Sequence, residues 1–228
     1  MYFKAGLSKP RFFCYADFMN EIFAVYKPKG ISSFAMIARV RKSLGIKKVG
    51  HAGTLDPLAQ GVLVVGVGRE ATKRLSSEVA KEKEYIAEIK LGESSTTDDA
   101  EGEKSSVSNR QPDKKEVEAV IAQFIGEIMQ IPPKFSAIKV GGRRAYKMAR
   151  TGEEVELKAR PALIKEMELL DYNYPILKIR TVTGPGVYIR SLARDIGQRL
   201  GVGAYMSELE RIRVGEFGVA DCRDLEIN

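Results

Sequence analysis

The sequence predicts an α+β fold, in which helices pack against a β-sheet. Apolar residues alternate with polar ones in some segments, as in half-buried strands, and recur with helical spacing in others. These segments follow one another without the regular βαβ alternation of a doubly wound fold. The chain has 228 residues, of which 44% are hydrophobic, and this length suits one large domain or one domain with an insertion.

The first half of the chain is predicted to contain a helix and several strands. The helix begins at Ser32 or Ser33, which are good N-cap residues, and ends at Gly45, a residue common after the last helical turn. Residues 61–68, GVLVVGVG, are apolar or glycine throughout, which is typical of a strand buried on both faces. Two further strands are expected at 22–26 and 85–91.

The second half is predicted to contain two amphipathic helices, at 115–124 and 189–200, because each shows one apolar stripe. A strand is expected at 175–182, where apolar and basic residues alternate. Residues 47–60 and 92–114 show no periodicity, and we expect both to be loops.

Composition excludes several classes of protein. The only histidine is His51, and the two cysteines, Cys14 and Cys222, form no CxxC pair, so neither a Cys/His zinc site nor a disulfide framework is expected. No run approaches 18 apolar residues, and no secretory signal is visible. We therefore expect a cytoplasmic protein without metal or membrane association. Because Met19 precedes the first strand, we expect translation to start there, so that residues 1–21 form an N-terminal extension of a domain at 22–228.

Positive charge is concentrated in one segment. The net charge is +7, and residues 134–150 hold six basic residues and no acidic one. Phe135 and Tyr146 lie among these cations and could stack on unpaired bases, so the segment favours RNA binding over a merely solvated charged face. The candidate contacts to the RNA backbone are Lys134, Lys139, Arg143, Arg144, Lys147 and Arg150.

The segment GHAGTLDPLAQG is dense in residues suited to chemistry. Pro57 biases Asp56 away from helical angles, so this loop can present the Asp56 carboxylate at a strand edge. Such an aspartate can serve as general base or nucleophile when a cation keeps it ionised, and it can equally be a turn residue bonded to nearby amides. Arg190, at the start of the last helix, is a candidate cation or simply solvent-facing, and Tyr85 by itself suits core packing.

A competing motif follows the buried strand. Gly66, Gly68 and Ala71 match GxGxxA, which occurs in dinucleotide-binding turns, so a nucleotide-dependent enzyme is an alternative. The match is short, and no Gly-Lys-Ser/Thr triplet of a P-loop is present.

Several segments together resemble the TruB-type tRNA pseudouridine-55 synthase family. In chain order they are IFAVYKPKGISS, GHAGTLDPLAQGVL, KEYIAEIKLG, PPKFSAIKVGGRRAYKMARTG, GVYIRSLARDIGQRLG and ELERIRVGEF. The similarity extends over residues 22–217, nearly the whole chain, and GTLDP together with the YIR segment is highly specific.

The resemblance implies a fold and a reaction. The fold would be that of pseudouridine synthases, a mixed, mostly antiparallel sheet with flanking helices and a central catalytic cleft. The reaction would be isomerisation of the T-loop uridine of tRNA, at position 55, after base flipping and without cofactor or metal. The partner is then tRNA, held in part by an RNA-clasping insertion at about 131–160, and we expect a monomer.

The resemblance also assigns roles to residues. Asp56 would be the catalytic aspartate, with Arg190 paired to it, and whether Asp56 attacks C6 or C1′ or assists deprotonation of the sugar stays open. The remaining assignments concern the flipped nucleotide, which would meet His51, stack on Tyr85 and be enclosed by Tyr188 and Leu209.

Two departures from the family pattern matter. Ser95 stands where the family usually has the first threonine of a T-x-T-x-D-x-x-G run, a change that we expect to affect loop packing only. The sequence ends at Asn228 without the C-terminal RNA-binding module of many relatives, so weaker and more salt-sensitive tRNA binding is expected. The alternative function is a non-catalytic tRNA-binding or RNA-folding protein on the same scaffold, which would not require Asp56.

Overall fold

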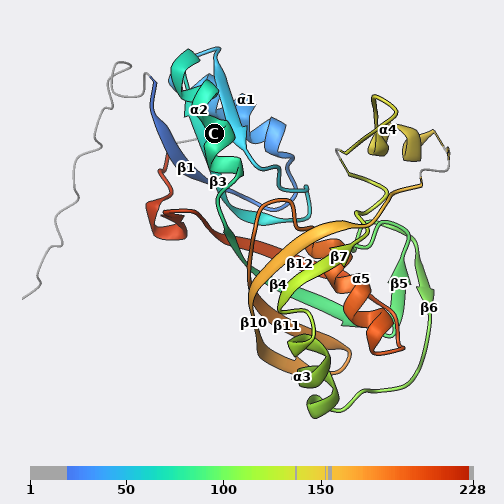
Figure 1. The fold of residues 1–228 in the computed structure, drawn as a ribbon. Helices are drawn as coiled ribbons and strands as arrows, with labels where there is room; N and C mark the ends of the chain where they lie inside the picture. Colours follow the sequence, from blue (N-terminus) through green and yellow to red (C-terminus); the bar gives the residue numbers. More distant parts are fainter. Residues whose placement is uncertain (1–19, 137, 152, 154–155, 226–228) are drawn as a thin grey trace, which may run out of the picture.

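The computed structural model describes residues 20–136, 138–151, 153 and 156–225 (Figure 1). Within these residues, nine strands form one large sheet. The main path, in spatial order, is β1 (Ile22–Lys27), β3 (Gln60–Val67), β12 (Ala204–Val214), β4 (Lys83–Leu91), β11 (Ile176–Thr183), β10 (Arg160–Asn173) and β7 (Gly126–Gln130). Two short strands complete it, β2 (Val49–Ala52) beside β3 and β13 (Phe217–Gly218) beside β12.

The sheet is antiparallel except where β12 pairs with β3, so the expected α+β fold with a mixed, mostly antiparallel sheet is confirmed. At the parallel junction the backbones approach closely, because a Cβ atom on Gly61 would lie 2.2 Å from the carbonyl oxygen of Arg211. Gly61 also has a φ of +110°, which side-chain-bearing residues rarely adopt. This junction unites the two halves of the sheet.

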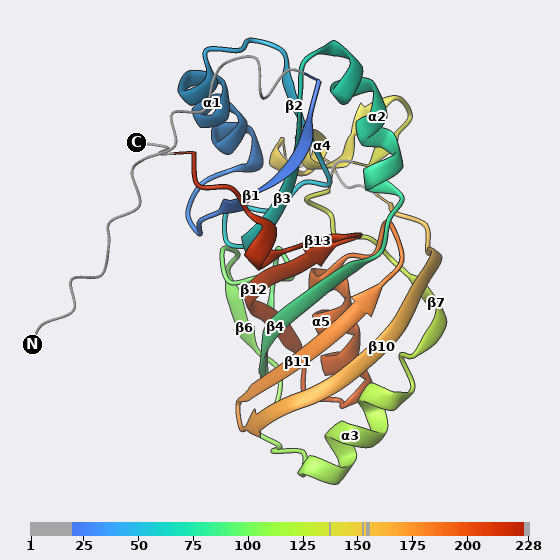
Figure 2. The same ribbon diagram turned by 90° about the vertical axis from the view of Figure 1, so that its left-hand side faces the viewer.

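Helices α1 (Ser33–Leu44) and α2 (Arg69–Val79) pack on the first half of the sheet, formed by β1, β2 and β3 (Figures 1 and 2). On β3, Leu63 belongs to a core cluster with Ile37 of α1, whereas Val64 belongs to a second cluster with Leu75 of α2. The prediction that this strand is buried on both faces is therefore confirmed.

The predicted ends of α1 are also found. The side chain of Ser32 accepts a hydrogen bond from the amide of Ala35 at 3.1 Å, and Gly45 ends the helix with a φ of 67°. Gly66 of the GxGxxA match is explained by packing, since a Cβ there would come within 3.1 Å of the backbone of Ala71 in α2.

Helices α3 (Lys114–Ala122) and α5 (Ile189–Arg199) pack on the second half of the sheet, and Figure 2 shows α5 behind β4 and β11. Along β4, alternate residues from Lys83 to Leu91 are buried, as the alternation in the sequence predicts. The other face carries charged side chains in cross-strand ion pairs, such as Arg180 with Glu84 at 2.6 Å. The buried residues of β4 therefore face the helices, and the charged residues between them face away.

Two expected loops contain strands. Residues 49–52 form β2, and the segment 92–114 includes a hairpin of β5 (Glu93–Ser95) and β6 (Lys104–Ser106). Both predictions were wrong in part because these short strands are held by backbone pairing, which leaves no apolar alternation in the sequence. Long strand β10 and strand β12 were not predicted either.

The insertion contains β8 (Lys139–Val140), β9 (Arg143–Arg144) and helix α4 (Ala145–Arg150), and Figure 1 shows it standing away from the large sheet. A short 3-10 helix, η2 (Val219–Asp221), follows β13. The expected start at Met19, with almost all of the predicted extension 1–21, lies outside the described residues, as do the side chains of Lys139, Lys147 and Arg150.

Candidate active site

The loop that carries Asp56 connects β2 to β3 and is fixed to the start of α1. Ser33 donates a hydrogen bond to the carbonyl of Leu55 and accepts one from the Leu55 amide, both at 2.8 Å. The amide of Ala59 donates to the carbonyl of Asp56 at 3.1 Å, which closes the turn. A buried serine and this turn therefore hold the backbone on both sides of the carboxylate.

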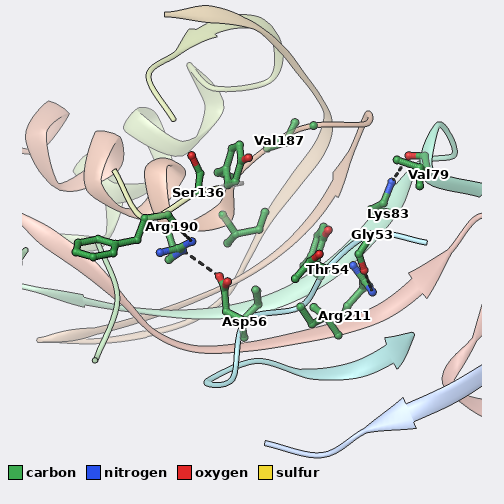
Figure 3. Close-up of a pocket in the computed structure, with 16 residues that line it drawn as sticks. Gly53, Thr54, Asp56, Val79, Lys83, Ser136, Val187, Arg190 and Arg211 are labelled. Atoms are coloured by element: carbon green, nitrogen blue, oxygen red, sulfur yellow. Dashed lines mark hydrogen bonds and ion pairs between the residues drawn. The ribbon is translucent and has the colours of Figure 1, made fainter. Parts of the chain in front are cut away.

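Arg190, in the first turn of α5, lies beside Asp56 (Figure 3). Its Nε atom is 3.0 Å from Oδ2 of Asp56, and its Nη1 atom is 3.3 Å from Oδ2 of Asp99. The guanidinium also donates to the carbonyls of Thr97 at 3.3 Å and Phe135 at 3.0 Å. Only 7% of the Arg190 side chain is exposed, so one buried cation ties three segments of the chain together.

Asp99 is the carboxylate on the other side of Arg190, and its side chain is 3% exposed. The hydroxyl of Thr97 donates to it at 2.5 Å, and the amide of Glu101 donates at 3.0 Å. Asp99 was not among the predicted site residues, although Thr97, Asp99 and Gly102 keep the later places of the family's T-x-T-x-D-x-x-G run. Its hydrogen bonds orient the carboxylate toward Arg190.

A cavity of about 270 Å³ lies between these groups and the sheet. Strand alternation places Tyr85 of β4 and both Leu209 and Arg211 of β12 in its wall, since Tyr85 is paired with Arg211 across the two strands. Tyr188 lines it from the residue before α5. The cavity thus contains five of the six residues predicted for catalysis and nucleotide binding: Asp56, Tyr85, Tyr188, Arg190 and Leu209.

The electrostatics of the cavity come from burial and from its cations. Burial raises the pKa of Asp56, the positive charges of Arg190 and Lys27 oppose the rise, and Asp99 adds to it. The Asp56 side chain keeps 36% of its surface accessible, so its carboxylate faces the cavity. Burial likewise raises the pKa of the Tyr85 hydroxyl, against the nearby charge of Arg211.

His51, the sixth predicted residue, lies on β2 and is not among the residues that line the cavity. Its Nδ1 atom is buried and has no hydrogen-bond partner among the described residues. Burial lowers the pKa of His51, and the charge of Arg211 lowers it further. The lowered pKa favours the neutral form of the imidazole. His51 thus lies outside the wall of the cavity in which the other five predicted residues lie.

The predicted RNA-clasping insertion contributes to the site where it begins. Phe135 and Ser136 line the cavity, whereas Lys134 lies in a neighbouring hollow with Asp98 and Arg194. Sequence reasoning did not place Phe135 or Ser136 in the wall, because which part of an insertion folds back onto a domain is not a local property.

The charge of the insertion is partly compensated. Arg143 forms an ion pair with Glu153, in which its Nη2 atom lies 2.7 Å from Oε1 of Glu153. Arg144 is exposed on the same hairpin. Arg143 therefore has a carboxylate partner just beyond the acid-free segment 134–150.

The described residues offer neither a cluster of metal ligands nor a membrane-spanning helix. They contain no group of three or more His, Cys, Asp or Glu side chains arranged to hold a metal ion. They also contain no helix with the length and apolar character needed to cross a bilayer.

Comparison with protein families gives two matches that together span most of the chain. The family described as "TruB family pseudouridylate synthase (N terminal domain)" matches residues 41–189. The one described as "tRNA pseudouridylate synthase B C-terminal domain" matches residues 190–227.

Curated relatives are similar over almost the whole chain. The chain is 49% identical to the tRNA pseudouridine synthase B of Parabacteroides distasonis over 218 residues, which is 92% of each protein. It is 47% identical to the protein of the same name from Phocaeicola vulgatus, over 91% of each chain. The tRNA pseudouridine synthase B of Ruegeria pomeroyi is 46% identical, over 89% of this chain and 67% of its own.

Solved structures share the fold. A chain in the crystal structure of a Cbf5-Nop10-Gar1 complex is 31% identical and superposes with a TM-score of 0.68, over 86% of this chain and 49% of its own. A chain in the structure of an H/ACA RNP bound to a substrate RNA containing 2′-deoxyuridine is 28% identical, with a TM-score of 0.65, over 86% and 48%. This chain thus spans about half the length of those structures.

Proposed function

The chain belongs to the TruB family of pseudouridylate synthases, and from this membership we propose that it isomerises the T-loop uridine of tRNA, at position 55, to pseudouridine. One observation supports the proposal most directly: Arg190 lies 3.0 Å from Asp56 in the wall of a cavity that Tyr85 also lines. The proposed catalytic aspartate thus faces a space next to an aromatic ring, as a reaction on a flipped base requires.

The reaction needs no change in composition. The bond between C1′ and N1 of uridine breaks, and a bond between C1′ and C5 forms in its place. A proton leaves C5 and one is gained at N1, so atoms and electrons balance without a redox partner. Because the uracil is detached for part of the reaction, the site must retain and turn it before the new bond forms.

Asp56 is the proposed catalytic group, and Arg190 is a positioning residue that holds its carboxylate. The carboxylate can act on C6 of the base, on C1′ or on a sugar proton, and each route requires its ionised form. The charge of Arg190 favours that form against the effect of burial. Tyr85 would stack on the uracil, and its buried hydroxyl remains protonated at neutral pH because burial raises its pKa.

The enclosure of the base is assigned to Tyr188, the residue before α5, and to Leu209 of β12, both of which line the cavity. We propose that His51 meets the flipped nucleotide outside the cavity wall, from its place on β2. The insertion would contact the RNA backbone through Lys134, Arg144 and its other basic residues, with Arg143 already paired to Glu153. We further propose that the protein acts as a monomer in the cytoplasm, with tRNA as its partner.

Release of tritium from a tRNA transcript labelled at C5 of uridine tests the proposal. Wild-type protein is expected to release tritium, and Asp56→Asn is expected to release none above background. Asp171→Asn, the same change at an exposed position on β10, is the matched control and should behave as wild type.

The same experiment separates the proposal from a non-catalytic tRNA-binding protein. Absence of release by wild-type protein that binds tRNA tightly would favour the binder. Equal release by wild type and Asp56→Asn would remove Asp56 from the mechanism.

A further inference from the structure

Two buried cations in the cavity have no part in the arrangement around Asp56. Lys83 is 6% exposed and Arg211 is 1% exposed, and both line the cavity. Neither residue forms an ion pair with a carboxylate in the described part of the chain. Lysine and arginine are almost never so deeply buried without a partner.

Four hydrogen bonds of these two side chains end on backbone carbonyls, and Arg211 also interacts with the hydroxyl of Tyr85. The Lys83 ammonium donates to the carbonyls of Val79 at 2.8 Å and Lys81 at 2.7 Å. Arg211 donates to the carbonyl of Val62 at 2.8 Å and to that of Gly53 at 3.0 Å. An ammonium has three donors and a guanidinium has five, so each cation keeps donors for a further acceptor.

The two positive charges disfavour each other. Burial lowers the pKa of Lys83 to about 8, and the charge of Arg211 contributes to that shift. Carbonyl dipoles offset only part of the cost of burying a full charge. An anion placed between the two side chains would supply the missing compensation.

Their position relates them to the reacting nucleotide. Lys83 lies two residues before Tyr85 on the same face of β4, a separation of about 7 Å along a strand, and Arg211 is paired with Tyr85 on β12. In Figure 3, Lys83 and Arg211 lie at one end of the cavity, and the pair of Asp56 and Arg190 lies at the other. If a base is stacked on Tyr85, a phosphate that flanks its nucleotide would therefore lie within reach of Lys83.

We propose that Lys83, with Arg211 beside it, binds a phosphodiester that flanks the flipped uridine. The inference rests on the proposed function, since the uracil and ribose are neutral and the flanking phosphates are the anions that an RNA substrate brings into the site. Binding one phosphate at this end fixes the nucleotide lengthwise, so that its glycosidic bond is held toward Asp56. Lys83 is then a substrate-positioning residue for the reaction.

Neutral backbone linkages provide the test. A T-arm hairpin is prepared in three forms: unmodified, with a methylphosphonate on the 5′ side of the target uridine, and with one on the 3′ side. Wild type, Lys83→Met and Lys81→Met are compared for RNA affinity and for pseudouridine formation. Lys81 is the matched control because it lies two residues away and pairs with Glu78 outside the cavity.

Lys83→Met is expected to weaken binding of the unmodified hairpin about tenfold, the effect of losing one hydrogen bond to a charged group. With one of the two methylphosphonate hairpins, wild type should lose a similar factor and Lys83→Met should lose almost nothing more. Lys81→Met should follow wild type on all three RNAs. Lys83→Arg, which keeps the charge, should keep the sensitivity to that linkage, and this variant serves if Lys83→Met does not fold.

Equal effects of Lys83→Met on all three hairpins would overturn the proposal, since the lysine would then act independently of either phosphate. The same holds if wild type is insensitive to both methylphosphonates. Failure of the proposed function is read separately, as absence of pseudouridine in the unmodified hairpin with wild type, whereas the affinity measurements still decide the phosphate contact.

Discussion

Replacing Arg190 with methionine is expected to destabilise the protein as well as to abolish activity. The substitution removes the cation between Asp56 and Asp99 and keeps a side chain of similar length. Asp56 can be hydrated from the cavity, because 36% of its side chain is accessible. Asp99 cannot, so its charge would stay buried without a cation.

The magnitude follows from the geometry of the pair. Unit charges 3.3 Å apart interact by about 5 kcal/mol at an effective dielectric constant near 20. Removing one partner of a buried pair typically costs about 3 to 5 kcal/mol. Because Thr97 and the Glu101 amide still donate hydrogen bonds to Asp99, we expect a loss of about 3 kcal/mol in the free energy of unfolding.

Urea unfolding of wild type, Arg190→Met, Asp99→Asn and the double variant measures this effect. Asp99→Asn removes the negative charge that Arg190→Met leaves buried without a cation. The double variant should therefore be more stable than the sum of the single losses predicts, by about 2 kcal/mol. Arg194→Met is the control, because Arg194 is on the same helix, is 22% exposed and pairs with Asp98 instead.

Additive losses in the double variant would refute the reasoning, because the cost would then come from lost packing rather than from an unpaired buried carboxylate. A coupling of the same size between Arg194→Met and Asp99→Asn would also refute it. That result would indicate a general effect of charge on the helix.

Three further predictions concern the site and its surroundings. Burial raises the pKa of Asp56, and the ionised form of Asp56 is the active one. As the pH is lowered, tritium release should therefore fall at a pH above 3.8, the ordinary pKa of an aspartate. A fall in activity centred on 3.8 would contradict this prediction. Gly61→Ala should lower the free energy of unfolding by about 3 kcal/mol or more, since its Cβ would overlap the backbone of Arg211, whereas Gly141→Ala, with open space around it, should cost about 1 kcal/mol in the same urea titration. Arg144→Glu should raise the KM for tRNA and lower the slope of log affinity against log salt by about one, and an unchanged slope would place the RNA elsewhere.

Elements with an unbroken local pattern could be predicted from the sequence. Strand β4 alternates along its whole length, β3 is apolar or glycine almost throughout, and the caps of α1 are ordinary cap residues. Strand β12 escaped prediction because its register with β4 shifts twice, between Met206 and Glu208 and between Arg211 and Arg213. Each irregularity resets the alternation, so that no period of two survives in the sequence.

The residues of the site likewise fall into those that a local sequence pattern predicts and those that it does not. The loop of Asp56 was recognisable from its own residues, whereas Asp99 and Arg211 reach the cavity through contacts between segments distant in the chain. The inward position of Lys83 could have been predicted from the sequence, since the alternation that places Tyr85 inward also places Lys83 inward two residues earlier. A lysine at such a position is normally taken as a strand end that reaches solvent, whereas here its ammonium donates to the carbonyl of Val79, the last residue of α2.

The order of strands in the sheet has a consequence for how the chain reaches its native state. Strands β3 and β4 are successive strands of the large sheet, yet they do not pair, because the much later β12 inserts between them. A growing polypeptide must therefore hold these two edges apart, or separate them again, until β12 arrives. Contacts between residues so distant along the chain form slowly. Closure of the sheet around β12 is thus expected to be a late event in folding, and the cavity walls can meet only then.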